Sequence, residues 1–448
     1  MTHKLTEGGI SRQLISLTVP LFIGNILQQL YHSADAIIIG RFAGDIEFAA
    51  IGVAGTVMNL FIFLIGGACG GIAIVMASLY GAGDMSGFRR ESFISTVFGL
   101  GFAVALSAIS VLLLSPVLNL ISTPDVLVPY IKEYLLIILG GMPAIFIYNL
   151  CAAALRSIGD TRRAALFLAI AVALNVLLDL LLVGAFGFGM AGAAWATVIS
   201  QLVSAALCII YIKYRQPFLI FKREDARCDK ALLRRTVKFA SISALNQSSL
   251  YIGKLLVQGV VNGISIDTIS GFTAASRIEA FSNSVGVSGG EALSVFVAQN
   301  MGAGRESRAR EGFLRGLFML AALGAVLSVA MYLPAVPLVG IFVGSGNPGP
   351  LADGAAYLRL ISVFYVICMA DCAFLGWNRG SGELDIFMAG TILQIVLRVS
   401  GSWLLAPALG IRAIALATGI GWSCLVVFKT VMYFIKRGMP KAEVRLKS

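Results

Sequence analysis

The stretch LISLTVPLFIGNILQQLYHSADAIIIG, residues 14–40, decides the fold class of this chain. It is long enough to cross a bilayer as a helix, which requires about 20 apolar residues, and it contains one formal charge, Asp35. Asn25, Gln28, His32 and Asp35 recur at intervals of three and four, so they share one helix face. A carboxylate at the centre of a spanning helix costs about 2.5–3.5 kcal/mol, so we expect Asp35 to face a cavity or a partner.

Pro20 and His32 belong to the same run and raise two separate expectations. Pro20 lacks a backbone donor, so it predicts a bend in the helix. His32 lies one turn from Asp35, where it could tune the carboxylate or relay its proton. A neutral imidazole that is hydrogen-bonded within the polar face is the simpler interpretation. Asp35 is also open to a structural interpretation, as a buried and paired carboxylate.

The composition predicts an all-α polytopic membrane protein. Of the 448 residues 58% are hydrophobic and 13% are charged, whereas a soluble domain carries about 25% charged residues. The polar start lacks the zones of a cleavable signal, so we expect the first span to stay in the mature protein. The net charge of +11 is typical of basic cytoplasmic loops and does not suggest nucleic acid. Two histidines, and seven cysteines without paired spacing, favour neither a zinc site nor disulfides.

Twelve apolar segments predict twelve transmembrane helices, near 14–40, 47–80, 90–118, 127–157, 162–186, 190–213, 234–262, 268–299, 312–340, 352–377, 384–406 and 411–436. Lys and Arg gather after segments two, four, six and eight and at the C-terminus. The positive-inside rule therefore predicts cytoplasmic termini and a cytoplasmic basic linker. We expect an N-lobe at 1–213, the linker at 214–233 and a C-lobe at 234–448.

The two halves resemble each other. GAGDMSGFR at 81–89 and GAGRESRAR at 302–310 share Gly-Ala-Gly, a Ser and an Arg at equal offsets, and both follow an even-numbered segment. Two further pairs of short matches occur in the same order. A six-plus-six duplication predicts two parallel repeats about an axis along the membrane normal, with the substrate path between them. The alternative is that Gly/Ala motifs recur by chance in helix packing.

Further polar residues lie inside the apolar segments. Asn175 and Asp179 are four apart and share a face, at a depth similar to that of Asp35 and Thr197. Their carboxylate, amide and hydroxyl oxygens suit a proton relay or a hard cation, so Asp35 and Asp179 are candidate ligands for Na⁺. Two carboxylates in one dry site do not both ionise easily. The alternative is that Asn175 and Asp179 bridge neighbouring helices.

The second half has its own buried charges. Asp371 aligns roughly with Asn149 in the repeat, which favours a cavity position for both. Lys254 falls at the repeat position of Asp35, and mutual ion pairing in the bundle interior is the alternative for the second-half charges, which include Glu279 and Arg398. We find no ATPase motif, nucleophile elbow or zinc-protease motif, so we do not expect an enzyme.

Several stretches together resemble the multidrug and toxic compound extrusion (MATE) family, in its DinF-like and MepA-like bacterial branch: PLFIGNILQQLYHSADAIIIGRFAG, LYGAGDMSGFRRE, ALRSIGDT, ALNVLLDLLLVGAFGFGMAGAAWATVISQ, and FTAASRIEAF with VAQNMGAG. The resemblance runs essentially from end to end. It implies two six-helix lobes around a central cleft in the bacterial cytoplasmic membrane. It also implies cation-driven export of amphipathic, often cationic, compounds by alternating access, with no cofactor and no nucleic-acid partner. We expect a monomer.

The resemblance also implies roles for residues. It assigns cation coupling to Asp35, Asn175, Asp179 and Thr197, with the helix bend at Pro20. We place the substrate cavity at Gln28, His32, Tyr134, Asn149 and Asp371. Where the NorM-like branch has an acid on helix seven, this chain has Lys254. A lipid-linked precursor flippase is the rival function, and its cleft should concentrate Arg and Lys.

Overall fold

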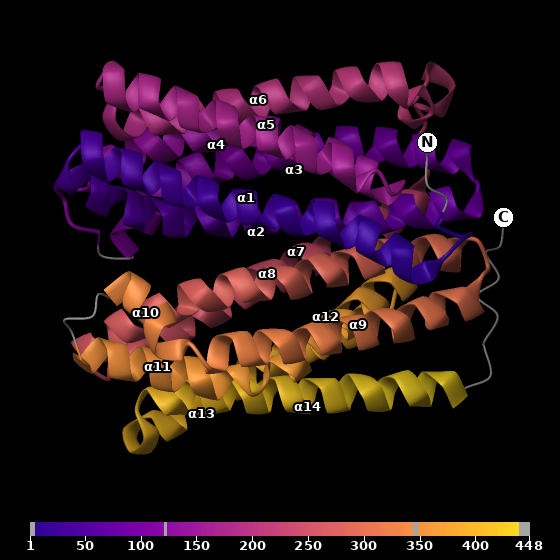
Figure 1. Cartoon of the computed structure of the whole chain (residues 1–448). Helices are drawn as coiled ribbons and strands as arrows, with labels where there is room; N and C mark the ends of the chain where they lie inside the picture. Colours follow the sequence, from indigo (N-terminus) through magenta and orange to yellow (C-terminus); the bar gives the residue numbers. More distant parts are fainter. Residues whose placement is uncertain (1–4, 121–122, 344–347, 439–448) are drawn as a thin grey trace. The chain divides into compact units, whose positions relative to one another are not determined.

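The computed structural model describes residues 5–120, 123–343 and 348–438, and all regular structure in these ranges is helical (Figure 1). The chain divides into two compact units. Unit one comprises Met1–Ser248 and Glu291–Gly312, and unit two comprises Ser249–Gly290 and Phe313–Ser448. Three helices contribute residues to both units: α7 (Lys230–Asn262), α8 (Ile266–Gly302) and α9 (Glu306–Tyr332). The lobe boundaries around 214–233 therefore stay a prediction.

Unit one is built around α4. The elements that lie wholly within unit one are α1 (Ile10–Phe42), α2 (Asp45–Ala82), α3 (Met85–Leu120), α4 (Val128–Ser157), α5 (Thr161–Asp179), the π-helix η1 (Leu180–Ala185), α6 (Gly189–Arg215) and the 3-10 helices η2 (Pro217–Leu219) and η3 (Arg223–Asp225). Most of α4 is buried, because it packs against α2, α3 and α6. A helix that is apolar on all sides is typical of such a central position. On another side of the unit, α1, α5, η1 and α6 pack together.

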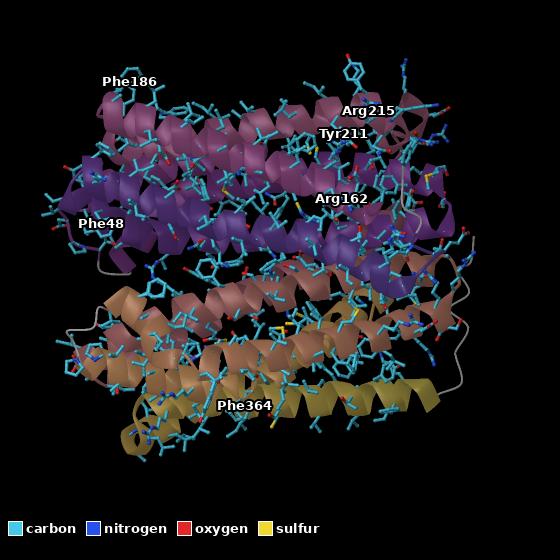
Figure 2. All side chains as sticks on the ribbon, in the orientation of Figure 1. Phe48, Arg162, Phe186, Tyr211, Arg215 and Phe364 are labelled. Carbon is cyan, nitrogen blue, oxygen red and sulfur yellow. The ribbon has the colours of Figure 1, made fainter. Side chains whose placement is uncertain are left out.

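Unit two is built around α14 (Ile411–Gly438). This helix packs against α11 (Pro348–Ser362), α12 (Tyr365–Ser381) and α13 (Leu384–Leu409), and the short α10 (Ala335–Val343) packs on α11. The chain bends by 56° between α11 and α12. Phe364 lies at this bend (Figure 2), and a Cβ at Gly419 of α14 would come within 2.4 Å of its ring. The bare glycine therefore makes room for the aromatic side chain at the bend.

The expected apolar segments all coincide with helices, and three of them are interrupted. Segment 162–186 is divided into α5 and η1, segment 312–340 into α9 and α10, and segment 352–377 into α11 and α12. Within the described ranges nine helices are long and apolar enough to cross a membrane, or ten if α11 and α12 form one span. Hydropathy indicates the length and polarity of a segment but not the residue at which its helix is interrupted. The positions of these interruptions are therefore given by the structure and not by the sequence pattern.

The basic loops of unit one share one end. Figure 2 shows Arg162, Tyr211 and Arg215 at one end of α5 and α6, and Phe48 and Phe186 at the opposite end. These arginines follow the fourth and sixth segments, where the sequence predicts cytoplasmic loops. Arg162 and Arg215 lie at the same end of unit one, as that prediction requires. Which side of the membrane this end faces stays an expectation.

The Gly-Ala-Gly motifs that indicate the duplication meet in a close helix crossing within unit one. A Cβ at Gly81 of α2 would lie 2.0 Å from the carbonyl oxygen of Gln299 of α8. Reciprocally, a Cβ at Gly302 would lie 2.0 Å from the carbonyl oxygen of Ser78. Both approaches are to backbone atoms, which cannot move aside as a side chain does. The first glycine of each motif is therefore required by the crossing itself.

We expect Gly81→Ala and Gly302→Ala each to destabilise the protein by about 1–3 kcal/mol, the usual cost of overpacking. The methyl group must push α2 and α8 apart. Thermal unfolding of the purified protein measures the effect. Gly66→Ala is the matched control, because Gly66 also lies on α2 and no atom lies within 4 Å of its ideal Cβ. Equal melting temperatures for all three variants would contradict the crossing.

An ion pair at the basic end fixes η3 against α3. Arg89 Nε donates to Asp225 Oδ2 at 2.7 Å, and the backbone N of Lys222 donates to the same oxygen at 3.0 Å. Both donors favour the ionised carboxylate, and the hydrogen bond from Arg89 is the main reason that the pKa of Asp225 lies below its usual range.

The lowered pKa of Asp225 sets the sign of a pH dependence. A carboxyl group with a depressed folded-state pKa contributes stability above its unfolded pKa, about 3.9, and loses it as the pH falls through the folded value. Wild type should therefore be more stable than Asp225→Asn at pH 7, and the difference should begin to shrink near about pH 4 and vanish only below the lowered folded-state pKa of Asp225. Unfolding in detergent across this range is the measurement, with Glu224→Gln as the control because Glu224 is mostly exposed. A difference that is independent of pH would argue against the pair.

Candidate functional site

A buried polar cluster lies where α1, α5 and α6 of unit one meet. Tyr31 and Asp35 come from α1, Asn175 and Asp179 from α5, and Thr197 from α6. The first four form two pairs spaced by four residues, so each pair lies on one face of its helix. Asn175 and Asp179 are fully buried, and Asp35 is 5% exposed. Burying two carboxyl groups is costly unless they are neutralised or hydrogen-bonded, so their contacts define what the cluster can do.

The amide of Asn175 joins the three helices. In the orientation that satisfies both ends of the amide, its nitrogen donates to Asp35 Oδ1 at 2.9 Å and to Asp179 Oδ2 at 3.2 Å. Its oxygen then accepts from the backbone N of Thr197 at 3.2 Å. In the reverse orientation the amide oxygen would face only acceptors. Asn175 therefore acts as a donor that lies between the two carboxyl groups.

Asp35 and Asp179 are bridged by the same nitrogen of Asn175, so the two carboxyl groups lie close together in a buried site. Two carboxyl groups in one dry site do not both ionise easily, so the arrangement favours a proton on one of them. The second oxygen of Asp179, Oδ1, is buried and has no hydrogen-bond partner among the described residues. The arrangement is a pair of carboxyl groups that can hold one shared proton and that leaves one oxygen open.

Tyr31 and Thr197 complete the cluster. The Tyr31 hydroxyl lies 2.7 Å from Thr197 Oγ1, which also contacts the carbonyl oxygen of Ala193 at 3.0 Å. Sequence reasoning missed this tyrosine, although its position four residues before Asp35 places it on the same face and could have revealed it.

The local backbone at Asp179 is unusual. Asp179 is the last residue of α5, and the next six residues form η1. π-Helical turns are rare and often mark functional sites. The turn after η1 is held in place because Glu47 accepts a hydrogen bond from the backbone N of Met190. Gly189 has φ +53, and a Cβ there would meet the Glu47 carboxylate, so glycine is required.

The structure brings together all four side chains that we expected to couple the cation. The substrate cavity that we expected stays a prediction, and its residues are described one by one. Gln28 is exposed on α1, and the side chain of His32 lies outside the described residues. Asn149 donates to the carbonyl oxygen of Ile145 on its own helix. The helix α1 continues through Pro20, so the bend there stays a prediction.

Two other expected cavity residues are buried in packed surroundings. Tyr134 lies near the cluster, since the charges of Asp35 and Asp179 act on it, but its hydroxyl donates to Met58 Sδ at 3.2 Å. Asp371 lies in unit two, where its Oδ1 accepts from Lys429 Nζ at 2.6 Å. The alternative of mutual ion pairing describes this aspartate better than a cavity position does.

The oxygen atoms of the cluster bear on which cation it could hold. Hard cations prefer oxygen ligands, which Asp35, Asp179 and Thr197 could supply. In the orientation that satisfies its own hydrogen bonds, the Asn175 amide points its nitrogen at both carboxyl groups, whereas the reverse orientation would add its oxygen to theirs. Among the described residues no group of three or more His, Cys, Asp or Glu side chains is arranged to hold a metal ion.

The fold and the buried site define a polytopic helical membrane protein of the transporter class. The MatE family model matches the chain twice, at residues 20–181 and 243–404, so the chain belongs to the MatE family. Members of this family are transporters and not enzymes. The paired matches place one copy of the repeat in each half, which agrees with the expected duplication.

Relatives and solved structures support the same assignment. The chain is 26% identical to the probable multidrug resistance protein YpnP of Bacillus subtilis over 98% of both chains. It is 25% identical to the probable multidrug resistance protein NorM of Thermotoga maritima, over 86% of this chain and 83% of that protein. A MATE family transporter of the MOP superfamily, solved in an outward-facing conformation, superposes with a TM-score of 0.90 at 22% identity over 97% of both chains.

Proposed function

We propose that this protein is a cation-coupled antiporter that exports amphipathic, often cationic, compounds by alternating access. The observation that carries the proposal is the bridge from the Asn175 amide to Asp35 and Asp179, two buried carboxyl groups on different helices that can share one proton. Relatives named as multidrug resistance proteins support the class of substrate. Both termini in the cytoplasm and a monomeric state are part of the same proposal.

The coupling follows from the chemistry of this pair. When the shared proton leaves, Asp35 and Asp179 become two like charges at close range in a dry site, and they repel each other. This repulsion weakens the packing of α1 against α5 and favours a second position of α1. If the carboxyl pair binds the proton more tightly in one of the two positions of α1, proton binding shifts the population toward that position. Proton binding and release thereby alternate between two arrangements of α1.

Transport in proteoliposomes under separate gradients tests the proposal. A pH gradient alone should drive efflux of an amphipathic dye, because the geometry at Asn175 favours a proton. A Na⁺ gradient alone should not. Efflux driven only by Na⁺ would show that the amide of Asn175 rotates to admit the metal ion and would overturn the proton assignment. No efflux under either gradient, with lipid translocation instead, would favour the flippase.

A further inference from the structure

We propose that a cavity of unit one, here called the acidic pocket, is a binding site for a monovalent organic cation. The cavity has a volume of about 440 Å³, and the side chains that carry the argument are those of Glu47, Tyr130, Glu133, Phe188 and Trp195. Small-molecule sites usually have volumes of about 300–1,000 Å³. The inference rests on the proposed export of cationic compounds and adds a site at which such a compound is held as it leaves.

The acidic pocket lies at the end of unit one opposite the basic loops. It is formed where α2 and α4 begin and where the turn after η1 enters α6. Phe48 follows Glu47 in the chain and Phe186 lies two residues before Phe188, and Figure 2 shows both labelled phenylalanines at this end. With the basic loops in the cytoplasm, as we expect, the pocket lies at the outer side, where an exported compound is released.

The pocket keeps a net negative charge. Within the described ranges neither Glu47 nor Glu133 forms an ion pair, and Lys132 does not line the cavity. Glu47 accepts a hydrogen bond from the backbone N of Met190 in the first turn of α6. The N-termini of α4 and α6 each contribute about half a positive charge, so together they offset one of the two carboxylates. About one negative charge remains, which a monovalent cation would neutralise.

Aromatic rings are the second feature of the pocket that points to an organic cation. Tyr130, Phe188 and Trp195 line the same cavity as the two carboxylates. The face of an aromatic ring attracts a cation, and tryptophan does so most strongly. Trp195 is 51% exposed and lies two residues before the buried Thr197, so its ring is on the other side of α6 from the coupling cluster.

Membrane anchoring explains the rings alone but not their combination with the carboxylates. Aromatic side chains are common where a helix reaches the membrane surface. Such an anchor requires no carboxyl group, whereas this cavity brings Glu47 and Glu133 together with three rings. Rings beside carboxylates that have no ion-pair partner are suited to an ammonium or phosphonium ion that carries apolar substituents.

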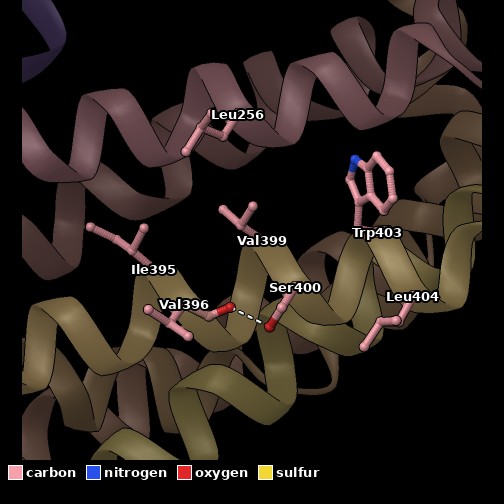
Figure 3. Close-up of a pocket in the computed structure, with 7 residues that line it drawn as sticks. All are labelled: Leu256, Ile395, Val396, Val399, Ser400, Trp403 and Leu404. Atoms are coloured by element: carbon pink, nitrogen blue, oxygen red, sulfur yellow. Dashed lines mark hydrogen bonds between the residues drawn. The ribbon is translucent and has the colours of Figure 1, made fainter.

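A groove in unit two shows that cavity size alone does not define such a site. It has a volume of about 510 Å³ and lies between α7 and α13, with Leu256 and Trp403 in its lining (Figure 3). None of the residues that line it carries a formal charge. The hydroxyl of Ser400 is bonded to the carbonyl oxygen of Val396, so the groove offers little polarity. The acidic pocket differs from it by its two carboxylates.

Protection of a thiol in the pocket tests the inference with the full-length protein. Ala191 lines the cavity, so Ala191→Cys places a thiol there that a methanethiosulfonate reagent can modify. Mass spectrometry of the labelled peptide keeps this thiol distinct from the native cysteines. Tetraphenylphosphonium is the cationic probe, and tetraphenylborate is an anion of the same shape. Tetraphenylphosphonium should slow the modification at a much lower concentration than tetraphenylborate does, because only the cation neutralises the pocket.

Substitutions in the Ala191→Cys background show which side chains bind the probe. Glu133→Gln and Trp195→Leu should each raise the half-protecting concentration of tetraphenylphosphonium about two- to fivefold, the usual effect of losing one partly exposed ionic or cation–π contact. Trp195→Phe should retain part of the affinity, because a ring is kept. Asp125→Asn is the matched control for Glu133→Gln, because Asp125 is an exposed carboxylate just before α4 that does not line the pocket.

The outcomes separate the pocket from the proposed function. Equal protection by the two ions, or a half-protecting concentration that neither Glu133→Gln nor Trp195→Leu changes, would overturn the cation site. Melting temperatures like that of the Ala191→Cys parent show that these variants are folded. Gradient-driven efflux of tetraphenylphosphonium without protection would refute the pocket alone. Protection without efflux under either gradient would refute the proposed transport and support the pocket as a binding site.

Discussion

Replacing Asp35 by asparagine should abolish gradient-driven efflux while folded protein stays in the membrane. The amide keeps the shape of the carboxyl group and its contact with Asn175, but it cannot take up or release a proton. One charge moved across 100 mV supplies about 2.3 kcal/mol, or roughly fifty-fold accumulation of a neutral substrate. In the variant the accumulation ratio should fall to about one, since no proton movement is coupled to the substrate.

The measurement is substrate accumulation in proteoliposomes under an imposed pH gradient. Asp125→Asn is the matched control, because it makes the same chemical change at an exposed carboxylate between α3 and α4. Asp179→Asn should reproduce the loss, because the partner of Asp35 is removed. Full gradient-driven activity in Asp35→Asn, with a melting temperature like that of wild type, would rule out coupling through this pair.

The second large effect concerns the buried ion pair of unit two. Lys429→Met should destabilise the protein by about 3–5 kcal/mol, because it leaves the Asp371 carboxylate buried without a partner. Replacing both partners, with Asp371→Val and Lys429→Met together, should restore most of this loss, since apolar side chains of similar size often substitute for a buried pair without cost. Thermal unfolding in detergent distinguishes the single from the double variant.

The control for this experiment lies on the same helix. Lys436 of α14 is 3.9 Å from Glu383 and 41% exposed, so Lys436→Met should cost no more than about 1 kcal/mol. If the double variant is as unstable as Lys429→Met, the two substitutions are independent, and the pair is not the source of the stability. If Lys429→Met loses transport but not stability, Asp371 returns to the substrate path, where we first placed it.

The sequence by itself was sufficient for features that depend on local pattern. The twelve apolar segments are all helical, because length and hydropathy along one chain determine whether a segment can cross a bilayer. Asn175 and Asp179, two of the four residues that we expected to couple the cation, share a face of α5 because they are spaced by four residues. The duplication was visible in the Gly-Ala-Gly motifs, and their glycines are required by the reciprocal crossing at Gly81 and Gly302.

Only the tertiary structure decided which polar groups are partners. Asp371 and Lys429 are 58 residues apart, and no local pattern indicates that their helices bring them to 2.6 Å. The amide of Asn175 on α5 can bridge α1 and α6 only because the fold places these three helices side by side. Tyr31 on α1 reaches Thr197 on α6 for the same reason. Helix pattern fixes the direction of each side chain relative to its own axis, whereas a contact depends on the rotation and depth of two helices. That is why the sequence singled out the buried carboxyl groups of Asp35 and Asp179 but not the pairing of the charges in unit two.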